Sequence, residues 1–214
     1  MIRVLGLETS GPLCRVAVGT WRARPLGAAA ALRDGRFVER TGGDGLARHA
    51  EVLLGLVDAA LRASGVRLRA LDGVAVSLGP GSFTGLRVGL AAAKTFAAFG
   101  PLPLAGVPTL AAMAAEAGGA GLLWTARDAG RGEVYAARFR AGPRGPRPAG
   151  AVAILPAAAL APGARTEPPR AATVAALGAA RLLGGRRDDP DRLVPLYVRR
   201  PEAEVRLRRA RARR

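Results

Sequence analysis

The stretch VAVSLGPGSFTGLRVG, residues 74–89, decides how the rest of the chain can be arranged. Its first part alternates valine with small residues, as a buried strand does, and its last part begins an apolar helix. Between the two, Gly79, Pro80, Gly81 and Gly85 interrupt regular structure. Such a turn directs backbone N–H groups at the space in front of the helix. The pattern predicts an α/β fold with either an anion site or a tight turn at this point.

The turn does not match the common phosphate-binding motifs. A P-loop ends in Gly-Lys-Ser/Thr, but the only lysine of the chain, Lys94, falls well inside the following helix. A dinucleotide fingerprint needs its third glycine at position 84, where Thr84 stands. The spacing alone fits two interpretations equally well: a tight turn in which the glycines are needed only for positive φ angles, and an anion site.

Length and composition restrict the class of protein. A chain of 214 residues can bury about 70% of its unfolded surface. Cys14 is the only cysteine, which excludes an internal disulfide and a cysteine-based metal cluster. Residues 1–10 lack the apolar segment of a signal peptide, and no stretch of about 18 strongly apolar residues could span a membrane. We expect a soluble cytoplasmic protein without membrane contact.

The net charge of +17 predicts attraction to nucleic acid. All but one of the 33 basic residues are arginine, and six arginines follow residue 205. Aromatic residues make up only 4% of the chain, too few for a platform that stacks single-stranded bases. The charge therefore indicates nonspecific attraction to RNA. We expect the basic tail, residues 201–214, to be flexible and either merely solvated or drawn to tRNA phosphates.

The remaining pattern predicts alternating strands and helices. Residues 3–8 and 13–19 read as a hairpin, and a third strand is expected at 28–33, before the turn signal Asp34-Gly35. Helices are expected at 46–64, closed by Gly65, and at 86–99. The proline-rich segment 142–170 predicts irregular structure with a short strand at 152–155, followed by a helix at 171–183.

The motif GPGSFTGLRVG at 79–89 resembles the signature of the TsaB family, the bacterial tRNA threonylcarbamoyladenosine biosynthesis proteins. Three later stretches are similar to further landmarks of that family: GVPTL at 106–110, DAGRGEVY at 128–135 and PLYVR at 195–199. The resemblance implies the ribonuclease-H-like fold of the actin, sugar kinase and Hsp70 superfamily (actin-like ATPase, ASKHA), with two lobes. We expect an N-terminal lobe at 1–100 and a reduced C-terminal lobe at 101–200.

In that superfamily an acidic residue at the end of the first strand holds a hydrated metal near nucleotide phosphates. Glu8 occupies this place, and with Gly79, Gly81 and Ser82 it would form a vestigial nucleotide site, although an acid at a strand end is more often merely solvated. Related catalytic enzymes bind metal through two histidines four residues apart. Here His49 is the only histidine and Leu53 stands four residues later, so no metal site is assigned.

The helix at 46–64 has an apolar arc about twice as wide as the roughly 100° stripe of a surface helix. The helix at 86–99 is rich in small residues, which allow close approach of a neighbour. Burial within the domain explains both features as well as a partner surface does, but the resemblance favours a surface that forms a homodimer and docks the catalytic subunit. The expected interface residues are Leu53, Leu56, Val57, Ala60, Gly89, Ala92, Ala93 and Phe96.

The resemblance implies a non-catalytic subunit of the machinery that adds threonylcarbamoyl to the adenosine next to the anticodon of tRNAs that read codons beginning with A. Its partners would be the catalytic subunit TsaD and the ATPase TsaE, with tRNA bound through the complex. No catalytic residue and no cofactor of its own are expected, and ATP or ADP would bind at the interface of the complex. The main alternative is an autonomous ATP-dependent enzyme that uses Glu8 and the turn at 79–85. The sequence lacks the metal ligands that a metalloprotease would need, and only the net charge supports a general RNA-binding protein.

Overall fold

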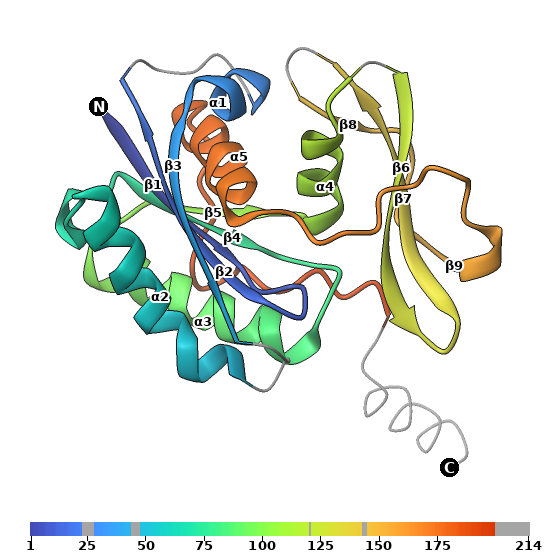
Figure 1. Cartoon of the computed structure of the whole chain (residues 1–214), viewed down its shortest axis with the longest axis horizontal. Helices are drawn as coiled ribbons and strands as arrows, with labels where there is room; N and C mark the ends of the chain where they lie inside the picture. The colour runs from blue at the N-terminus through green and yellow to red at the C-terminus, as the bar shows by residue number, and fades with distance from the viewer. Residues whose placement is uncertain (23–27, 44–47, 120, 143–144, 200–214) are drawn as a thin grey trace.

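The computed structural model describes residues 1–22, 28–43, 48–119, 121–142 and 145–199 (Figure 1). Its larger layer is a five-stranded sheet in the order β3-β2-β1-β4-β5. The strands are β1 (Ile2–Glu8), β2 (Cys14–Trp21), β3 (Arg36–Gly42), β4 (Gly73–Ser77) and β5 (Leu104–Val107). The β1–β4 and β4–β5 pairs are parallel, whereas β1–β2 and β2–β3 are antiparallel.

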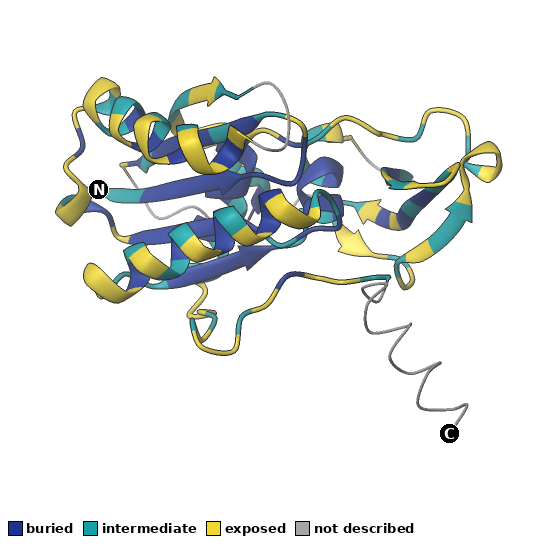
Figure 2. Cartoon of the chain, turned by 90° about the horizontal axis from the view of Figure 1, so that it is seen from below, coloured by how far each residue is buried: buried dark blue, intermediate teal, exposed yellow. Residues whose placement is uncertain are grey.

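Helices cover both faces of this sheet. On one face lie α2 (His49–Ser64) and α3 (Phe83–Phe99), and on the other lie α1 (Ala28–Asp34) and α5 (Ala171–Leu183). Figure 2 shows the central strands buried between helices whose outer sides are exposed. A sheet covered on both faces needs nearly continuous apolar strands, which is the pattern of β1 and β4. The arrangement confirms the expected ribonuclease-H-like fold.

A second, smaller sheet follows β5. It consists of β6 (Gly121–Gly130), β7 (Glu133–Ala141), β8 (Arg147–Pro148) and β9 (Ala153–Pro156), and α4 (Thr109–Ala117) lies against β6 and β7. Two short 3-10 turns, Leu68–Ala70 and Ala157–Ala159, complete the elements. The chain then returns to the first sheet through α5. Both β5 and α5 therefore pack with the first sheet, although they follow residue 100 in the sequence.

The strand predicted at 28–33 is wrong, since this segment forms α1. Its run of four alanines favours helix over strand. The short helix covers Trp21, whose indole Nε1 donates a hydrogen bond of 2.8 Å to the carbonyl of Ala31. The third strand, β3, begins only at Arg36, after the predicted turn at Asp34-Gly35.

The other helices lie close to their expected bounds. Gly65 closes α2 with φ of 67°, as predicted, and α5 spans the predicted residues 171–183. The prediction that α2 begins at residue 46 and the prediction of a flexible tail at 201–214 lie outside the described residues. Helix α3 begins at Phe83, three residues before its predicted start, because Ser82 caps it: the Ser82 Oγ accepts from the N–H of Gly85 at 3.0 Å.

In the part of the chain that the structure describes, no helix has both the length and the apolar character needed to cross a membrane.

Candidate functional site

Three N–H groups of the glycine-rich turn, those of Gly79, Ser82 and Gly85, bind groups of the protein itself. Gly79 has φ of 99° and donates its N–H to Thr109 Oγ1 at 3.1 Å. The N–H of Ser82 donates to the carbonyl of Ser10 at 2.9 Å, and that of Gly85 donates to the Ser82 hydroxyl. These donors are therefore engaged in the fold. The geometry favours the tight-turn interpretation over an open anion site.

Three glycines of this region allow the loop after β1 to lie directly on the start of α3. A Cβ atom at Gly81 would lie 2.4 Å from the carbonyl oxygen of Ser10, and one at Gly85 would lie 2.1 Å from that of Thr9. At Gly89 a Cβ would lie 2.2 Å from the Thr9 hydroxyl. Each distance is too short for a real side chain. The signature glycines are thus required by close backbone packing.

Glu8 is fully buried at the end of β1. Its Oε1 accepts from the N–H of Ser10 at 2.6 Å and from the Ser10 hydroxyl at 2.5 Å, while its Oε2 has no hydrogen-bond partner among the described residues. Burial raises the pKa of Glu8, and the bonds from Ser10 and the charge of Arg127 oppose that rise. Arg127 comes from β6, and its own pKa is lowered by burial. The carboxyl group is thus held inside the protein.

Residues 195–199, the PLYVR stretch, join the two sheets beside the turn, and we refer to them as the strap. The N–H of Leu196 donates to the carbonyl of Leu78 at 2.7 Å. The hydroxyl of Tyr197 accepts from Arg87 of α3 at 3.2 Å, and Arg199 pairs with Glu133 of β7. The cavity between the strap and the turn is about 80 Å³. That volume is well below the 300 Å³ or more (roughly) of a usual small-molecule pocket.

Three further polar side chains have structural partners. His49 is buried, its Nε2 lies 3.3 Å from the carbonyl of Pro12, and burial lowers its pKa. Asp128 accepts from the N–H of Gly130 at 2.9 Å within the hairpin turn, and Glu133 pairs with Arg199. The described residues contain no group of three His, Cys, Asp or Glu side chains that could hold a metal ion.

Most of the expected interface residues face the core of their own lobe. The buried ones are Leu53, Val57, Ala60, Gly89 and Ala93, and the partly buried ones are Leu56, Ala92 and Phe96. The wide arc of α2 has a physical reason, because the helix contacts β2, β3 and α3 together. Val57 among the buried members and Phe96 among the partly buried ones also line the groove described next. The other buried members can affect a partner only through the fold.

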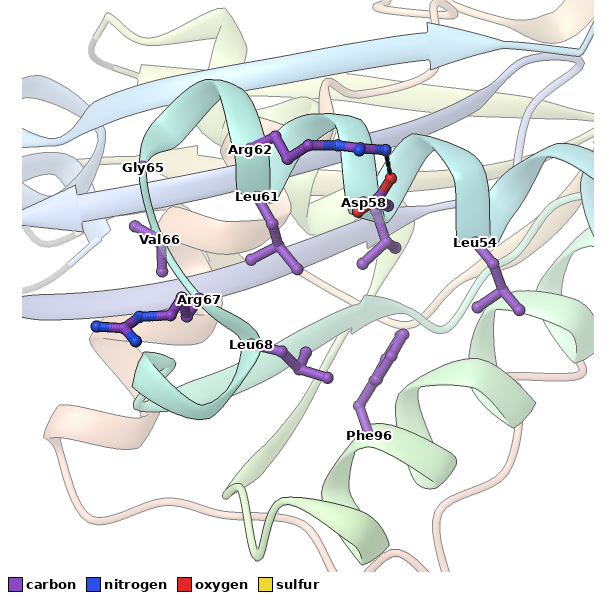
Figure 3. A pocket seen from close by; sticks show the side chains of 10 residues that line it. Leu54, Asp58, Leu61, Arg62, Gly65, Val66, Arg67, Leu68 and Phe96 are labelled. Atoms are coloured by element: carbon purple, nitrogen blue, oxygen red, sulfur yellow. Dashed lines mark hydrogen bonds and ion pairs between the residues drawn. The ribbon is translucent and has the colours of Figure 1, made fainter.

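An open apolar groove lies between α2 and α3 (Figure 3). Its volume is about 590 Å³, and four apolar side chains that point into it are Leu54, Leu61, Leu68 and Phe96. Leu54 is 63% exposed and Leu68 is 44% exposed. An Asp58–Arg62 ion pair lies along the α2 side. Sequence reasoning missed Leu54 and Leu68, although Leu54 belongs to the arc that it described and Leu68 follows the helix end at Gly65.

Comparisons with known proteins agree with this fold. A family model described as "TsaD: tRNA N6-adenosine threonylcarbamoyltransferase" matches residues 44–167. The chain is 33% identical over 142 residues to tRNA threonylcarbamoyladenosine biosynthesis protein TsaB of Escherichia coli. The aligned region covers 65% of this chain and 55% of that protein. It is 38% identical over 169 residues to an uncharacterised protein of Mycobacterium bovis, which covers 73% of this chain and 77% of the relative. The match thus spans little more than half the length of the Escherichia coli relative.

Solved structures give the same result over nearly the whole chain. YeaZ from Pseudomonas aeruginosa superposes with a TM-score of 0.78 at 26% identity, over 92% of this chain and 100% of that one. A second structure, described as similar to peptidase YeaZ of the same organism, has a TM-score of 0.79 at 26% identity. The signature at 79–89, the fold and these likenesses agree, and the chain belongs to the TsaB (YeaZ) family, within the wider group of the TsaD family model.

Proposed function

We propose that this protein is a non-catalytic subunit of the machinery that adds threonylcarbamoyl to the adenosine next to the anticodon of tRNAs that read codons beginning with A. Family membership and the printed name of the Escherichia coli relative support this role. In this proposal the chain forms a homodimer when alone and scaffolds the catalytic subunit TsaD. TsaE joins that pair, and tRNA is bound through the complex.

The observation that carries the proposal is the difference between the turn and the groove. The side chain of Glu8 is buried and held by Ser10, and the strap leaves only about 80 Å³ beside the turn. This supports a chain whose glycine-rich turn holds no cofactor, with ATP or ADP of the complex bound at its interface. The groove of about 590 Å³, in contrast, exposes apolar side chains.

We place the docking surface at this groove and its borders. A groove lined by Leu54, Leu68 and Phe96 suits the apolar side of a partner helix. Arg67 and the Asp58–Arg62 pair lie at its rim and can set the orientation of a partner through polar contacts. Of the residues expected from the sequence, Phe96 and the largely buried Val57 line this groove, whereas Leu56 and Ala92 do not.

The decisive experiment measures association of the full chain with TsaD from the same source. Leu54→Glu introduces an unpaired charge into the groove, and it should weaken the complex at least tenfold, because an interface residue of this kind contributes about 1.4 kcal/mol or more. The matched control is Leu122→Glu, since Leu122 is also exposed, at 53%, but lies on β6 away from the groove. Thermal melting checks that both variants fold. If Leu54→Glu and Leu122→Glu weaken TsaD binding equally, or if neither weakens it, the docking surface lies outside the groove.

The rival enzyme has its own test. The purified chain alone should show no ATP hydrolysis above background. Robust turnover that Glu8→Ala abolishes would favour an autonomous enzyme over a scaffold.

A further inference from the structure

One face of the larger sheet is covered by α2, and its side chains change from apolar to polar where that helix ends. The row of side chains under the helix is apolar and consists of Leu5, Val18 and Val38, which lie opposite one another on β1, β2 and β3. The next row, two residues away on each strand, is polar and consists of Arg3, Thr20 and Arg36. Because side chains alternate between the two faces, both rows lie on the same face. The sheet thus extends beyond its covering helix with a polar strip.

A cavity of about 800 Å³ lies over this strip. The strip forms part of its lining, Arg22 adds a third arginine just after β2, and residues 63–66 at the end of α2 form a wall. The volume lies in the usual range of roughly 300–1,000 Å³ for small-molecule sites. It is about ten times the space between the strap and the turn.

Two of the three arginines have no partner among the residues that the structure describes. In the described ranges, no hydrogen bond or ion pair engages the guanidinium groups of Arg22 and Arg36. Arg3 donates to the carbonyl of Ala70 at 3.3 Å. The one acidic residue of the lining, Asp34, lies 3.1 Å from the guanidinium of Arg33, so its charge is already compensated. The cavity therefore has an excess of positive charge.

The end of α2 does not cancel this charge. The C-terminal end of a helix is negative because its last carbonyl groups are free. Here the carbonyl of Leu61 accepts from the N–H of Val66 at 3.1 Å and from the hydroxyl of Ser64 at 2.9 Å, and the carbonyl of Arg62 accepts from the N–H of Gly65 at 3.1 Å. These hydrogen bonds reduce the acceptor capacity at the wall of the cavity.

We propose that this cavity binds the phosphate group of a nucleotide, either free or within an RNA strand. Arg22 and Arg36 can each present a planar fork of N–H donors, which matches phosphate oxygens. Thr20 lies opposite Arg36 in the same row, and its hydroxyl donates to the carbonyl of Arg36 at 3.4 Å. The site lies at the opposite end of β1 from Glu8. It goes beyond the proposed scaffold role, since it needs neither TsaD nor the groove.

The test uses the full chain and two probes, ATP and a short fluorescent single-stranded RNA. The double variant Arg22→Ala/Arg36→Ala should weaken binding of one or both probes at least tenfold. For RNA it should also flatten the slope of log affinity against log salt by about 0.7 for each lost phosphate contact. The control Arg40→Ala/Arg140→Ala removes the same charge from exposed positions outside the cavity and should change affinity less than twofold.

A second variant separates a built site from general charge. Arg36→Lys keeps the charge but loses the planar fork, so it should still weaken binding measurably. Loss of ATP binding identifies a free nucleotide as the ligand, and loss of RNA binding alone identifies a strand. The proposal is overturned if the cavity and control double variants lose affinity equally, or if neither probe responds. Because TsaD is absent from this assay, its result is independent of the Leu54→Glu experiment.

Discussion

Helix α3 borders two surfaces that differ sharply. At its start, Gly85 and Gly89 lie against Thr9, and the N–H groups of Gly79 and Gly85 are bonded within the protein. Toward its end, Phe96 lines an apolar groove that α3 shares with α2. One end of the helix thus closes against its own chain, and the other is open.

This difference shows why a glycine-rich turn does not by itself define an anion site. The turn has the strand, the glycines and the helix start that such a site needs. An anion site also needs N–H groups that are free to reach a ligand, but Ser82 donates to Ser10 and Gly79 donates to Thr109. The partner of each N–H group is decided by tertiary contacts, which no local motif contains.

The largest effect is expected where two neighbouring residues of α2 face opposite environments. Leu53 is 2% exposed and Leu54 is 63% exposed. Leu53→Ala should lower the free energy of unfolding by about 3 kcal/mol, because it leaves a cavity in the core. Leu54→Ala should change it by less than about 0.5 kcal/mol. Denaturant unfolding measures both, and similar losses would mean that the groove is part of the core.

The next prediction concerns the closed end of α3. Gly85→Ala places a methyl group against the carbonyl of Thr9 and should cost about 2 to 3 kcal/mol of stability. The control is Gly55→Ala on α2, where the added Cβ meets no described atom within 4 Å beyond its chain neighbours and the backbone of its own helix turn. That change should stabilise the protein by about 0.5 to 1 kcal/mol, because alanine favours helix. If thermal melting ranks the two variants in the reverse order, the loop after β1 does not lie on α3 as described.

Local signals were sufficient for several elements. The N-terminal hairpin follows from alternation, α2 ends at Gly65, and α5 ends before Gly184-Gly185. The polar residues Glu51, Asp58 and Arg62 of α2, with Arg48 just before it, are all exposed, as their helical spacing indicates. Each of these features depends on residues that are close in the chain.

Other features depend on distant contacts. An apolar arc shows that α2 is covered, but not whether a partner or its own sheet covers it, and in the fold Leu53 and Val57 of this arc are buried. The groove needs Leu68 and Phe96, which lie 28 residues apart in the numbering and meet only in the fold. The cavity over Arg3, Thr20 and Arg36 depends on strand register, which composition cannot provide.

A smaller effect on stability is expected at the contact between α4, which lies against the smaller sheet, and α5, which lies against the larger one. Glu116 of α4 accepts from the N–H of Arg170 at 2.6 Å and from the hydroxyl of Thr173 at 2.5 Å, so it caps the start of α5. Glu116→Gln should cost about 1 kcal/mol, because it removes the charge at the positive end of the helix. The control is Glu51→Gln, whose exposed pair with Arg48 should contribute less than about 0.5 kcal/mol. If urea unfolding gives the same loss of stability for both variants, Glu116 does not cap α5.

The last prediction tests whether the end of β1 is closed, through the pH dependence of stability. Burial holds the pKa of Glu8 above its ordinary value of 4.5, so the folded state binds this proton more tightly than the unfolded state. Stability from Glu8 is then fully present below pH 4.5 and is lost as the pH rises through the folded pKa. His49 acts in the opposite direction, since its lowered pKa makes stability fall as the pH drops below 6.5. The measurement compares the thermal stability of Glu8→Gln with that of the unmodified protein at each pH. Because both proteins contain His49, its contribution cancels in the difference. We expect Glu8→Gln to become more stable relative to the unmodified protein as the pH rises. A difference that does not change with pH would mean that the Glu8 carboxyl reaches solvent, which would reopen the nucleotide-site interpretation of the turn.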